Sequence, residues 1–448
     1  MKKNIALLEK APVPKAILYL AIPSVLAMMV QVIYGLTDTF FIGQTGDPNL
    51  VASVSLVLPF AMILQALGNI FAFGGGAYIS QMLGAKRPEE ARHISASSFY
   101  LAILTGLLLA GVGQLLIHPI LSFLGTSSVV WDSTKTYLSI MISCSFVQIL
   151  QIVLAGLLRS EGATKKAMYG ILVGTGLNII FDYLFIMCFG WGIAGAAWAT
   201  ILGNFGGVIY YLLYFRFSGT LLSIRWRDFK PSKEMIGSII AIGLPVAINT
   251  LIMSVSHILT NNVAISYGEN TMAASGIMGR LLAVGIFLQM GIAQGYQPFA
   301  GYSYGAKRFD RLKSGFLMAL GFSAVIGVTI AITFFAFGHS LVSLFIDNDE
   351  VISRAVIMIN AFAWGLPLFA FNFLTGMTFQ SAGRPRLALI LVLLRQLGLF
   401  LPMLYGLDYF FGFRGFIFAQ PVSDLPIGIL SFILLHHFFK SPRLGKRI

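Results

Sequence analysis

The sequence predicts an all-α integral membrane protein whose twelve transmembrane helices form two six-helix bundles. Of its 448 residues, 57% are hydrophobic and only 10% are charged, whereas a soluble domain carries about 25% charged residues. The apolar stretches last about 20 residues or more, which is the length needed to cross a hydrocarbon core of about 30 Å. Motifs of the first half also recur in the second half, about 221 residues later.

Twelve apolar runs account for the predicted helices. They lie at residues 16–43, 50–75, 94–117, 134–157, 167–189, 193–215, 237–265, 273–297, 314–337, 353–377, 387–406 and 415–438. The first run is too long for a signal-peptide core and lacks an obvious small-residue cleavage site, so we expect it to be retained. Cys144 and Cys188 lie within apolar runs without the spacing of a metal site or a disulfide framework, so we expect packing roles for both.

The net charge of +13 follows the predicted topology. In a soluble protein, such an excess would suggest nucleic acid as a partner. Here 25 of the 30 Lys and Arg residues lie in the two tails and the even-numbered loops. Of the other five, Lys135 and Arg354 border odd loops as the second residues of their runs, Arg414 lies in an odd loop, and Arg280 and Arg395 lie deeper inside apolar runs. The positive-inside rule therefore predicts that both termini are cytoplasmic, and we expect no nucleic-acid partner.

The internal duplication defines two lobes. The motif LGAKR at 83–87 recurs as YGAKR at 304–308, and LRSEGATKKA at 158–167 parallels FQSAGRPRLA at 379–388. Because six helices, an even number, separate the copies, both halves enter the membrane with the same orientation. Parallel repeats of this kind are typical of transporters in which one bundle moves against the other.

The predicted domain boundaries follow from this repeat. We expect an N-lobe at residues 1–215 and a C-lobe at residues 235–448. A basic cytoplasmic linker at residues 216–234 would join them.

Three carboxylates, Asp38, Asp182 and Asp424, lie inside apolar runs, where a charged side chain costs about 2.5–3.5 kcal/mol. Counting along the helices at 1.5 Å per residue places Asp38, Asp182 and Thr200 at a shared depth, roughly 10 Å below the outer boundary. Asn178 lies one turn from Asp182 on the same helical face. Their oxygen atoms could accept a proton or a hard cation such as Na⁺. The alternative is that these residues only hydrogen-bond helices together.

Further polar residues in apolar runs are candidates to line a substrate cavity. They are Gln31, Tyr34, Asn204, His257, Asn261 and Arg280. Gln31 and Tyr34 share a polar stripe with Asp38. For His257, titration near neutrality and a packing role are both open, and we favour packing.

Two other features have mainly structural interpretations. Pro23 removes one backbone hydrogen bond and favours a kink fifteen residues before Asp38. Whether this kink is static or moves is open. Arg395 and Asp424 both fall near the middle of the membrane, so we expect a mutual ion pair.

A twelve-helix parallel duplication is typical of two transporter folds. The major facilitator fold normally has an acidic loop rich in Gly and Arg after its second helix, and GAKRPEEARH is a poor match. Three segments, IPSVLAMMVQVIYGLTDTFFIG, LNIIFDYLF and GIAQGYQPFAGYSYGAKR, resemble recurrent segments of the multidrug and toxic compound extrusion (MATE) family, in the right order. The similarity covers nearly the whole chain and is strongest to bacterial MepA-like or DinF-like members.

This resemblance implies a MATE/MOP-type fold and a secondary active antiporter of the cell membrane, functional as a monomer without a cofactor. It would export amphipathic, often cationic drugs or toxic organic cations by alternating access in exchange for H⁺ or Na⁺. In the family, an Asp of the first helix, an Asn-x-x-x-Asp pair of the fifth and a Thr of the sixth form a cation site. Asp38, Asn178, Asp182 and Thr200 match this pattern, and relatives are thought to bend at the residue matching Pro23.

The resemblance does not extend to a second coupling site. Some relatives carry carboxylates in the seventh and tenth helices, and the corresponding runs at 237–265 and 353–377 contain no acid. Within the first lobe, two acids at one depth repel each other when both are ionised, so retention of one proton is expected near neutral pH. We therefore favour H⁺ over Na⁺ as the coupling ion.

Other functions fit the sequence less well. A flippase for lipid-linked precursors would share the superfamily architecture, but such proteins often have extra helices and several cationic residues in the cavity. A receptor or scaffold would not require two acids at matched depth. We find no Walker loop, HExxH or GxSxG motif, so an enzyme is not expected.

Overall fold

The computed structural model describes residues 2–440, apart from the side chains of residues 2–4, 36 and 39, and this part of the chain contains helices and connections but no strand. The first half comprises α1 (Lys2–Lys10), α2 (Val13–Gly43), α3 (Pro48–Gly84), α4 (Pro88–Leu115), α5 (Ile117–Phe123), α6 (Trp131–Ser143), α7 (Ser145–Ser160), α8 (Thr164–Asp182), the π-helix η1 (Tyr183–Cys188), α9 (Gly192–Phe217) and the 3₁₀ turn η2 (Trp226–Asp228). The second half comprises α10 (Lys233–Ser266), α11 (Glu269–Gly305), α12 (Phe309–Ser343), α13 (Asp349–Ala363), α14 (Leu366–Ser381), α15 (Pro385–Leu393), the π-helix η3 (Leu394–Phe400), α16 (Leu401–Phe411) and α17 (Phe413–Lys440).

The helices match the predicted spans in number and order. Ten helical segments of the described chain are long and apolar enough to cross a membrane, and the bent pairs α6 with α7 and α13 with α14 complete a set of twelve. The helices extend beyond the apolar runs, as in α3, which ends at Gly84 instead of residue 75. The chain is a multi-pass membrane protein, and the predicted fold class is confirmed.

Two of the spans are bent, which the apolar runs did not predict. The fourth span bends by 51° at Cys144, where Ser145 Oγ donates a hydrogen bond to the carbonyl oxygen of Gly106 at 2.9 Å. A Cβ atom on Gly106 would lie 2.4 Å from Phe146 Cα, so the bent segment packs directly on the α4 backbone. The tenth span bends by 46° just before Pro367, whose missing N–H suits the first turn of α14.

The helices pack into two compact units. Unit 1 consists of Met1–Lys10 and Met29–Thr250, and unit 2 consists of Ala11–Met28 and Leu251–Ile448. Helices α2 and α10 each contribute residues to both units. This division by packing differs from the lobes 1–215 and 235–448, which rest on the sequence repeat and stay a prediction.

In unit 2, the first half of α2 packs closely on α11. A Cβ atom on Gly295 would lie 2.5 Å from Ala21 Cα, and one on Gly291 would lie 2.6 Å from Val25 Cα. Small residues permit this approach of two helix backbones in a membrane protein. The glycines therefore explain why the segment Ala11–Met28 belongs to unit 2.

Unit 1 contains the same arrangement between α3 and the first half of α10. A Cβ atom on Gly74 would lie 2.0 Å from the carbonyl oxygen of Ile239, and one on Gly243 would lie 2.1 Å from that of Ile70. Each unit thus contains half of a helix that continues into the other unit.

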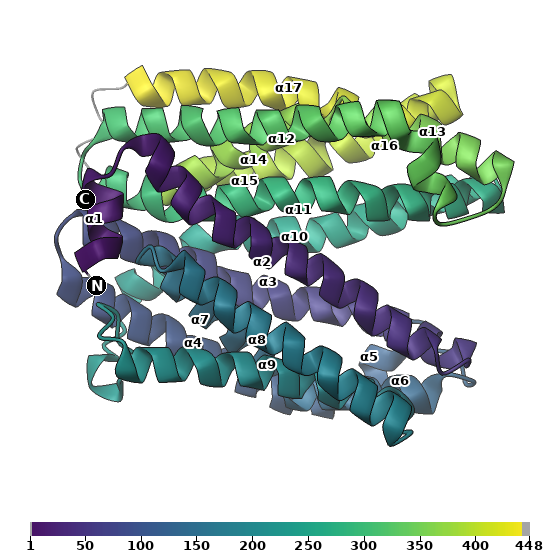
Figure 1. Ribbon diagram of the computed structural model, residues 1–448, viewed down its shortest axis with the longest axis horizontal. Helices are drawn as coiled ribbons and strands as arrows, with labels where there is room; N and C mark the ends of the chain where they lie inside the picture. The colour runs from purple at the N-terminus through teal and green to yellow at the C-terminus, as the bar shows by residue number, and fades with distance from the viewer. Residues whose placement is uncertain (1, 441–448) are drawn as a thin grey trace. The chain divides into compact units, whose positions relative to one another are not determined.

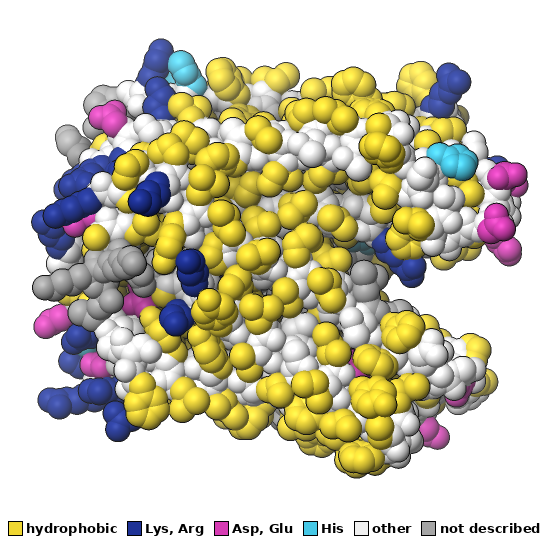
Figure 2. All heavy atoms as spheres, in the orientation of Figure 1, with side chains coloured by type: hydrophobic (Ala, Val, Ile, Leu, Met, Phe, Trp, Pro, Cys, Tyr) yellow, Lys and Arg dark blue, Asp and Glu magenta, His cyan; other side chains and the backbone are white. Residues whose placement is uncertain are grey.

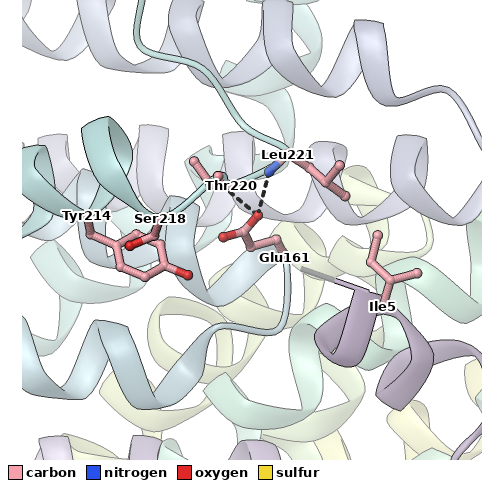
Figure 3. Close-up of a pocket in the computed structure, with 7 residues that line it drawn as sticks. Ile5, Glu161, Tyr214, Ser218, Thr220 and Leu221 are labelled. Carbon is pink, nitrogen blue, oxygen red and sulfur yellow. Dashed lines mark hydrogen bonds between the residues drawn. The ribbon is translucent and has the colours of Figure 1, made fainter.

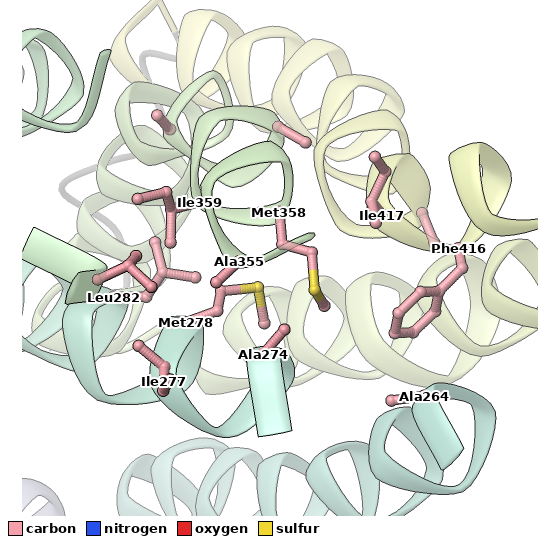
Figure 4. Packing of buried hydrophobic residues seen from close by; sticks show 14 of the residues in the cluster. Ala264, Ala274, Ile277, Met278, Leu282, Ala355, Met358, Ile359, Phe416 and Ile417 are labelled. Atoms are coloured by element: carbon pink, nitrogen blue, oxygen red, sulfur yellow. The ribbon is translucent and has the colours of Figure 1, made fainter. Parts of the chain in front are cut away.

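Within each unit, neighbouring helices run side by side. In unit 2, α12 packs against α11 and α14, and α14 packs against α17 (Figure 1). In unit 1, α8 and α9 form the most extensive helix pair (Figure 1). Buried apolar side chains of α10, α11, α13 and α17 form a core cluster of unit 2 (Figure 4), including Ala274, Met278, Met358, Ile359 and Phe416.

The surface of each unit matches a membrane environment. Exposed hydrophobic side chains cover the face shown in Figure 2, and Lys and Arg side chains gather at one end of each unit. On α12, Val325, Ile332 and Phe337 are 60% or more exposed. A basic end is what the positive-inside rule requires of a cytoplasmic side, although the orientation itself stays a prediction.

Candidate cation-coupling site

Unit 1 brings together the four residues predicted to couple cations. Asp38 lies on the second half of α2, Asn178 and Asp182 lie near the end of α8, and Thr200 lies on α9. Asp182 is fully buried, and Asn178 and Thr200 are 2% and 5% exposed. Asp38 is half-buried, and its carboxylate is close enough to Asp182 for the two charges to interact.

Glycine contacts between α8 and α9 fix the position of Asn178. A Cβ atom on Gly203 would lie 2.7 Å from both the Asn178 Cβ atom and the carbonyl oxygen of Gly174. On the same faces, one on Gly207 would lie 2.9 Å from the carbonyl oxygen of Gly170. The two helices therefore touch backbone to backbone over one turn, with Asn178 at the edge of the contact.

The carboxylates of this site lack hydrogen-bond partners among the side chains that the structure describes. Both oxygens of Asp182, the amide group of Asn178 and Oδ1 of Asp38 are buried and unsatisfied. Asn178 interacts with the Asp182 carboxylate, but without a hydrogen bond of normal geometry. An unsatisfied buried polar group costs about 1–3 kcal/mol, and more when it is charged.

The donor set fits a proton or a hard cation. Protonation would neutralise one carboxylate and give it a donor, whereas Na⁺ would take oxygen ligands from the carboxylates and the Asn178 amide. No three His, Cys, Asp or Glu side chains between residues 2 and 440 come together as a transition-metal site would require.

Two tyrosines complete the cluster. The Tyr34 hydroxyl lies 3.3 Å from Thr200 Oγ1, with either oxygen able to donate. Tyr137 of α6 is 5% exposed and interacts with Thr200 and both carboxylates. From sequence, Tyr34 was expected in the substrate cavity, and Tyr137 was missed. The only signal for Tyr137 in the sequence is a phenol within an apolar run, because its contacts are with residues far away along the chain.

Asp182 also marks a change in helix geometry. It is the last residue of α8, and the π-helix η1 begins at Tyr183. π-Helical turns are rare and often lie at functional sites. The turn is packed from α9, where a Cβ atom on Gly195 would lie 3.1 Å from the carbonyl group of Phe185.

Pro23 lies in the part of α2 that belongs to unit 2. It is buried within a continuous helix, and Ser24 Oγ donates to the Leu20 carbonyl oxygen at 3.1 Å. Asp38 follows on the same helix in unit 1. A moving kink and a static kink at Pro23 both remain predictions.

The candidate cavity residues are divided between the units. Gln31, Tyr34 and Asn204 are partly buried in unit 1, and His257, Asn261 and Arg280 are exposed in unit 2. For His257, the packing role and the titrating role both stay predictions. A common substrate cavity stays a prediction. Arg395 and Asp424 form an ion pair within unit 2, with Nε to Oδ1 at 2.7 Å.

Unit 1 also has a buried carboxylate outside the spans, Glu161, which lies in a small pocket (Figure 3). Glu161 Oε2 accepts hydrogen bonds from Thr220 Oγ1 at 2.7 Å and from the Leu221 backbone N–H at 3.2 Å. Ile5, Tyr214 and Ser218 also line this pocket. Burial raises the pKa of Glu161, and the two hydrogen bonds partly oppose this rise. Glu161 thus anchors the beginning of the segment that follows α9.

We expect Glu161→Gln to remove a pH-dependent part of the stability of unit 1. Because burial raises the pKa of Glu161 in the folded state above its ordinary value of 4.5, the folded state favours the neutral acid. Its contribution is therefore fully present below pH 4.5 and is lost as the pH rises through the folded-state pKa.

The apparent Tm of purified protein between pH 4 and pH 8 measures this effect. The Tm of wild type should fall relative to that of Glu161→Gln as the pH rises. Glu89→Gln, which changes an exposed side chain, is the matched control and should follow wild type. Parallel pH profiles for wild type and Glu161→Gln would contradict the prediction.

Comparison with known sequences extends over nearly the whole chain. The MatE family model matches residues 23–184 and again residues 245–405. The multidrug export protein MepA of Staphylococcus aureus (strain MSSA476) is 31% identical over 430 residues, which cover 96% of this chain and 94% of MepA. MepA of Staphylococcus saprophyticus is 28% identical with the same coverage.

Solved structures give the same result. A multidrug resistance MATE family transporter of the MOP superfamily, solved in an outward-facing conformation, matches with a TM-score of 0.93, 26% identity and 99% coverage of both chains. A MATE protein in complex with MaL6 matches with a TM-score of 0.94, 26% identity and full coverage of both chains. A MOP superfamily transporter from Pyrococcus furiosus matches with a TM-score of 0.92, 27% identity and 99% coverage of both chains. For that protein, a reversed polarity of the binding pocket suggests a different function.

Proposed function

The chain belongs to the MatE family of multidrug-exporting membrane transporters, and from this membership and its buried carboxylates we propose that it is a cation-coupled antiporter. Its substrates would be amphipathic, often cationic compounds, since the MepA relatives are multidrug export proteins. The sequence carries no Walker loop for ATP, so we expect an ion gradient to supply the energy for export.

The observation that carries this proposal is the cluster of Asp38, Asp182 and Asn178 with its unsatisfied buried oxygens. A helix-gluing role would leave these groups hydrogen-bonded to one another or to neighbouring helices. Intramembrane carboxylates that instead lack partners are expected to exchange a proton or an ion during function.

The cycle follows from the charge of this cluster. In the outward-facing state, the site takes up the coupling ion, which removes the repulsion between the Asp38 and Asp182 carboxylates. Neutralisation then favours a different packing of α2 and weakens drug binding, so the drug leaves. After return to the inward-facing state, the ion is released into the cytoplasm, and the site is ready for the next drug molecule.

We assign the coupling ion as H⁺ and the orientation as cytoplasmic for both termini. Two carboxylates within interaction range share a proton more readily than they share Na⁺, because one proton relieves their repulsion and needs no further ligand. The basic end of each unit supports the orientation (Figure 2). The protein would act as a monomer in the cell membrane, since one chain contains both units and the complete carboxylate cluster.

Reconstituted proteoliposomes test the choice of ion. We expect an imposed pH gradient without Na⁺ to drive uptake of a fluorescent cationic drug at least several-fold above liposomes without protein. An inward Na⁺ gradient at matched pH should add little. Transport driven by a Na⁺ gradient alone would show that Na⁺, and not H⁺, is the coupling ion. Transport of lipid-linked precursors instead of drugs would favour a flippase.

A further inference from the structure

The buried ion pair of unit 2 is more elaborate than a simple contact between helices. Arg395 binds Asp424 through two bonds, Nε to Oδ1 at 2.7 Å and Nη2 to Oδ2 at 3.3 Å. The Asp424 side chain is 2% exposed and that of Arg395 is 11% exposed. Gln420 Nε2 donates to the same Oδ1 at 3.2 Å, and the Arg395 guanidinium lies 4.9 Å from the centre of the Phe369 ring. The guanidinium is therefore held by charge, hydrogen bonds and a cation–π contact.

Two packing glycines relate this pair to unit 1. Gly195 and Gly415 lie near the starts of α9 and α17, and each packs on the backbone of the preceding helix, against Phe185 and Leu407 respectively. Aligning these two glycines, which lie 220 residues apart, places Gln420 opposite Thr200 and Asp424 opposite Asn204.

The two units therefore carry polar groups at matching positions of their last helix. In unit 1, Thr200 belongs to a cluster of carboxylates that has no bound side-chain cation among the described residues. In unit 2, Asp424 already holds a cation that belongs to the chain itself. Asn372 Nδ2 donates to the backbone carbonyl oxygen of Asp424 at 3.3 Å, and its Oδ1 is a buried acceptor without a partner.

Arg395 lies in an unusual stretch of backbone. It is the second residue of η3, a π-helix that interrupts the eleventh span between α15 and α16. Such a turn carries an extra residue relative to an α-helix and changes the direction of the side chains that follow it. This geometry accompanies the placement of the guanidinium against Asp424 instead of toward the lipid.

We propose that Asp424 and Gln420 form a cation site in unit 2 that takes planar guanidinium-type cations, and that Arg395 fills it as a tethered guanidinium. The site is thereby closed to the coupling ion, so that unit 1 alone exchanges ions during transport. This inference concerns binding in unit 2 and does not depend on the identity of the transported drug.

Removing the tethered cation tests the proposal. Arg395→Ala leaves Asp424 buried and unpaired, so we expect a lower apparent Tm in the purified, full-length protein. Guanidinium chloride is then added at roughly 1–20 mM, far below denaturing concentrations. It should raise the Tm of this variant by several degrees, and the increase should saturate. Tetramethylammonium chloride at equal ionic strength is the control for a general salt effect. Wild type and Arg386→Ala, which removes an exposed arginine of the same unit outside the candidate cavity, should show no increase.

Further variants make the outcome decisive. The double variant Arg395→Ala/Asp424→Asn has no carboxylate for the cation and should lose the response to guanidinium. If Arg395→Ala does not yield folded protein, Arg395→Gln keeps a hydrogen-bond donor toward Asp424 and is tested in the same way. An equal response of single and double variants, or no response in either single variant, would show that Arg395 serves only as a structural ion pair.

Discussion

Asp182→Asn is expected to reduce gradient-driven export to the background of protein-free liposomes while leaving the protein folded. Asp182 is fully buried, and no described side chain bonds to its oxygens with normal geometry. An amide of nearly the same size therefore removes no hydrogen bond that the fold needs. It cannot change its charge, so it cannot respond to the ion gradient. Asp38→Asn should have the same effect, and Thr200→Ala a milder one.

The measurement separates loss of coupling from loss of folding. The Asp182→Asn protein should elute as a single species, keep its apparent Tm within a few degrees of wild type and still bind drug. Asp310→Asn changes an exposed carboxyl group in unit 2 and should export at the wild-type rate. Full export by Asp182→Asn would remove that residue from the coupling site.

The second large effect is expected at the glycines that join half-helices to the units. In Gly74→Ala, the new Cβ atom would lie 2.0 Å from the Ile239 carbonyl oxygen, and in Gly295→Ala it would lie 2.5 Å from Ala21 Cα. Both contacts are with backbone, so two helices must separate to accommodate one methyl group. We expect each variant to lose about 1–3 kcal/mol or more of stability and to be recovered from membranes in much lower yield.

Matched controls lie on α10, the helix that Gly74 contacts, and on α11, the helix that carries Gly295. At Gly237 on α10 and Gly276 on α11, an added Cβ atom would have no neighbour within 4 Å. Replacing a helical glycine by alanine at such an open position stabilises by up to about 1 kcal/mol. Gly237→Ala and Gly276→Ala should therefore have the same Tm as wild type or a higher one. Normal stability of Gly74→Ala and Gly295→Ala would show that the helices can separate at little cost.

The helices and the repeat could be predicted from sequence because both depend on local composition. Any run of about 20 apolar residues must form a helix across the membrane, since lipid offers no partner for free backbone groups. The convergence of Asp38 and Asp182 was also predictable, because depth can be counted along a helix. The ion pair of Arg395 with Asp424 followed from their similar depth and opposite charge.

Features that depend on contacts between distant segments could not be predicted. The bend at Cys144 rests on Gly106 of another helix, and the contact of Tyr137 with the carboxylate cluster joins α6 to residues of α2 and α8. The π-helical turns after Asp182 and around Arg395 leave no mark in hydropathy. The sequence repeat indicated where each half begins, but not that α2 and α10 would each divide their residues between two units.

The shared helix α2 has a consequence for biosynthesis. Its first half, within Ala11–Met28, packs in unit 2 against Gly291 and Gly295, which are synthesised roughly 270 residues later. At about 5–20 residues per second, a growing chain needs roughly 15–55 s to cover that distance. During this time, the N-terminal segment lies in the bilayer without α11, the helix against which it packs in the folded protein. Unit 2 can therefore reach its final packing only after α11 has left the ribosome, although its segment Ala11–Met28 is synthesised before almost all of unit 1.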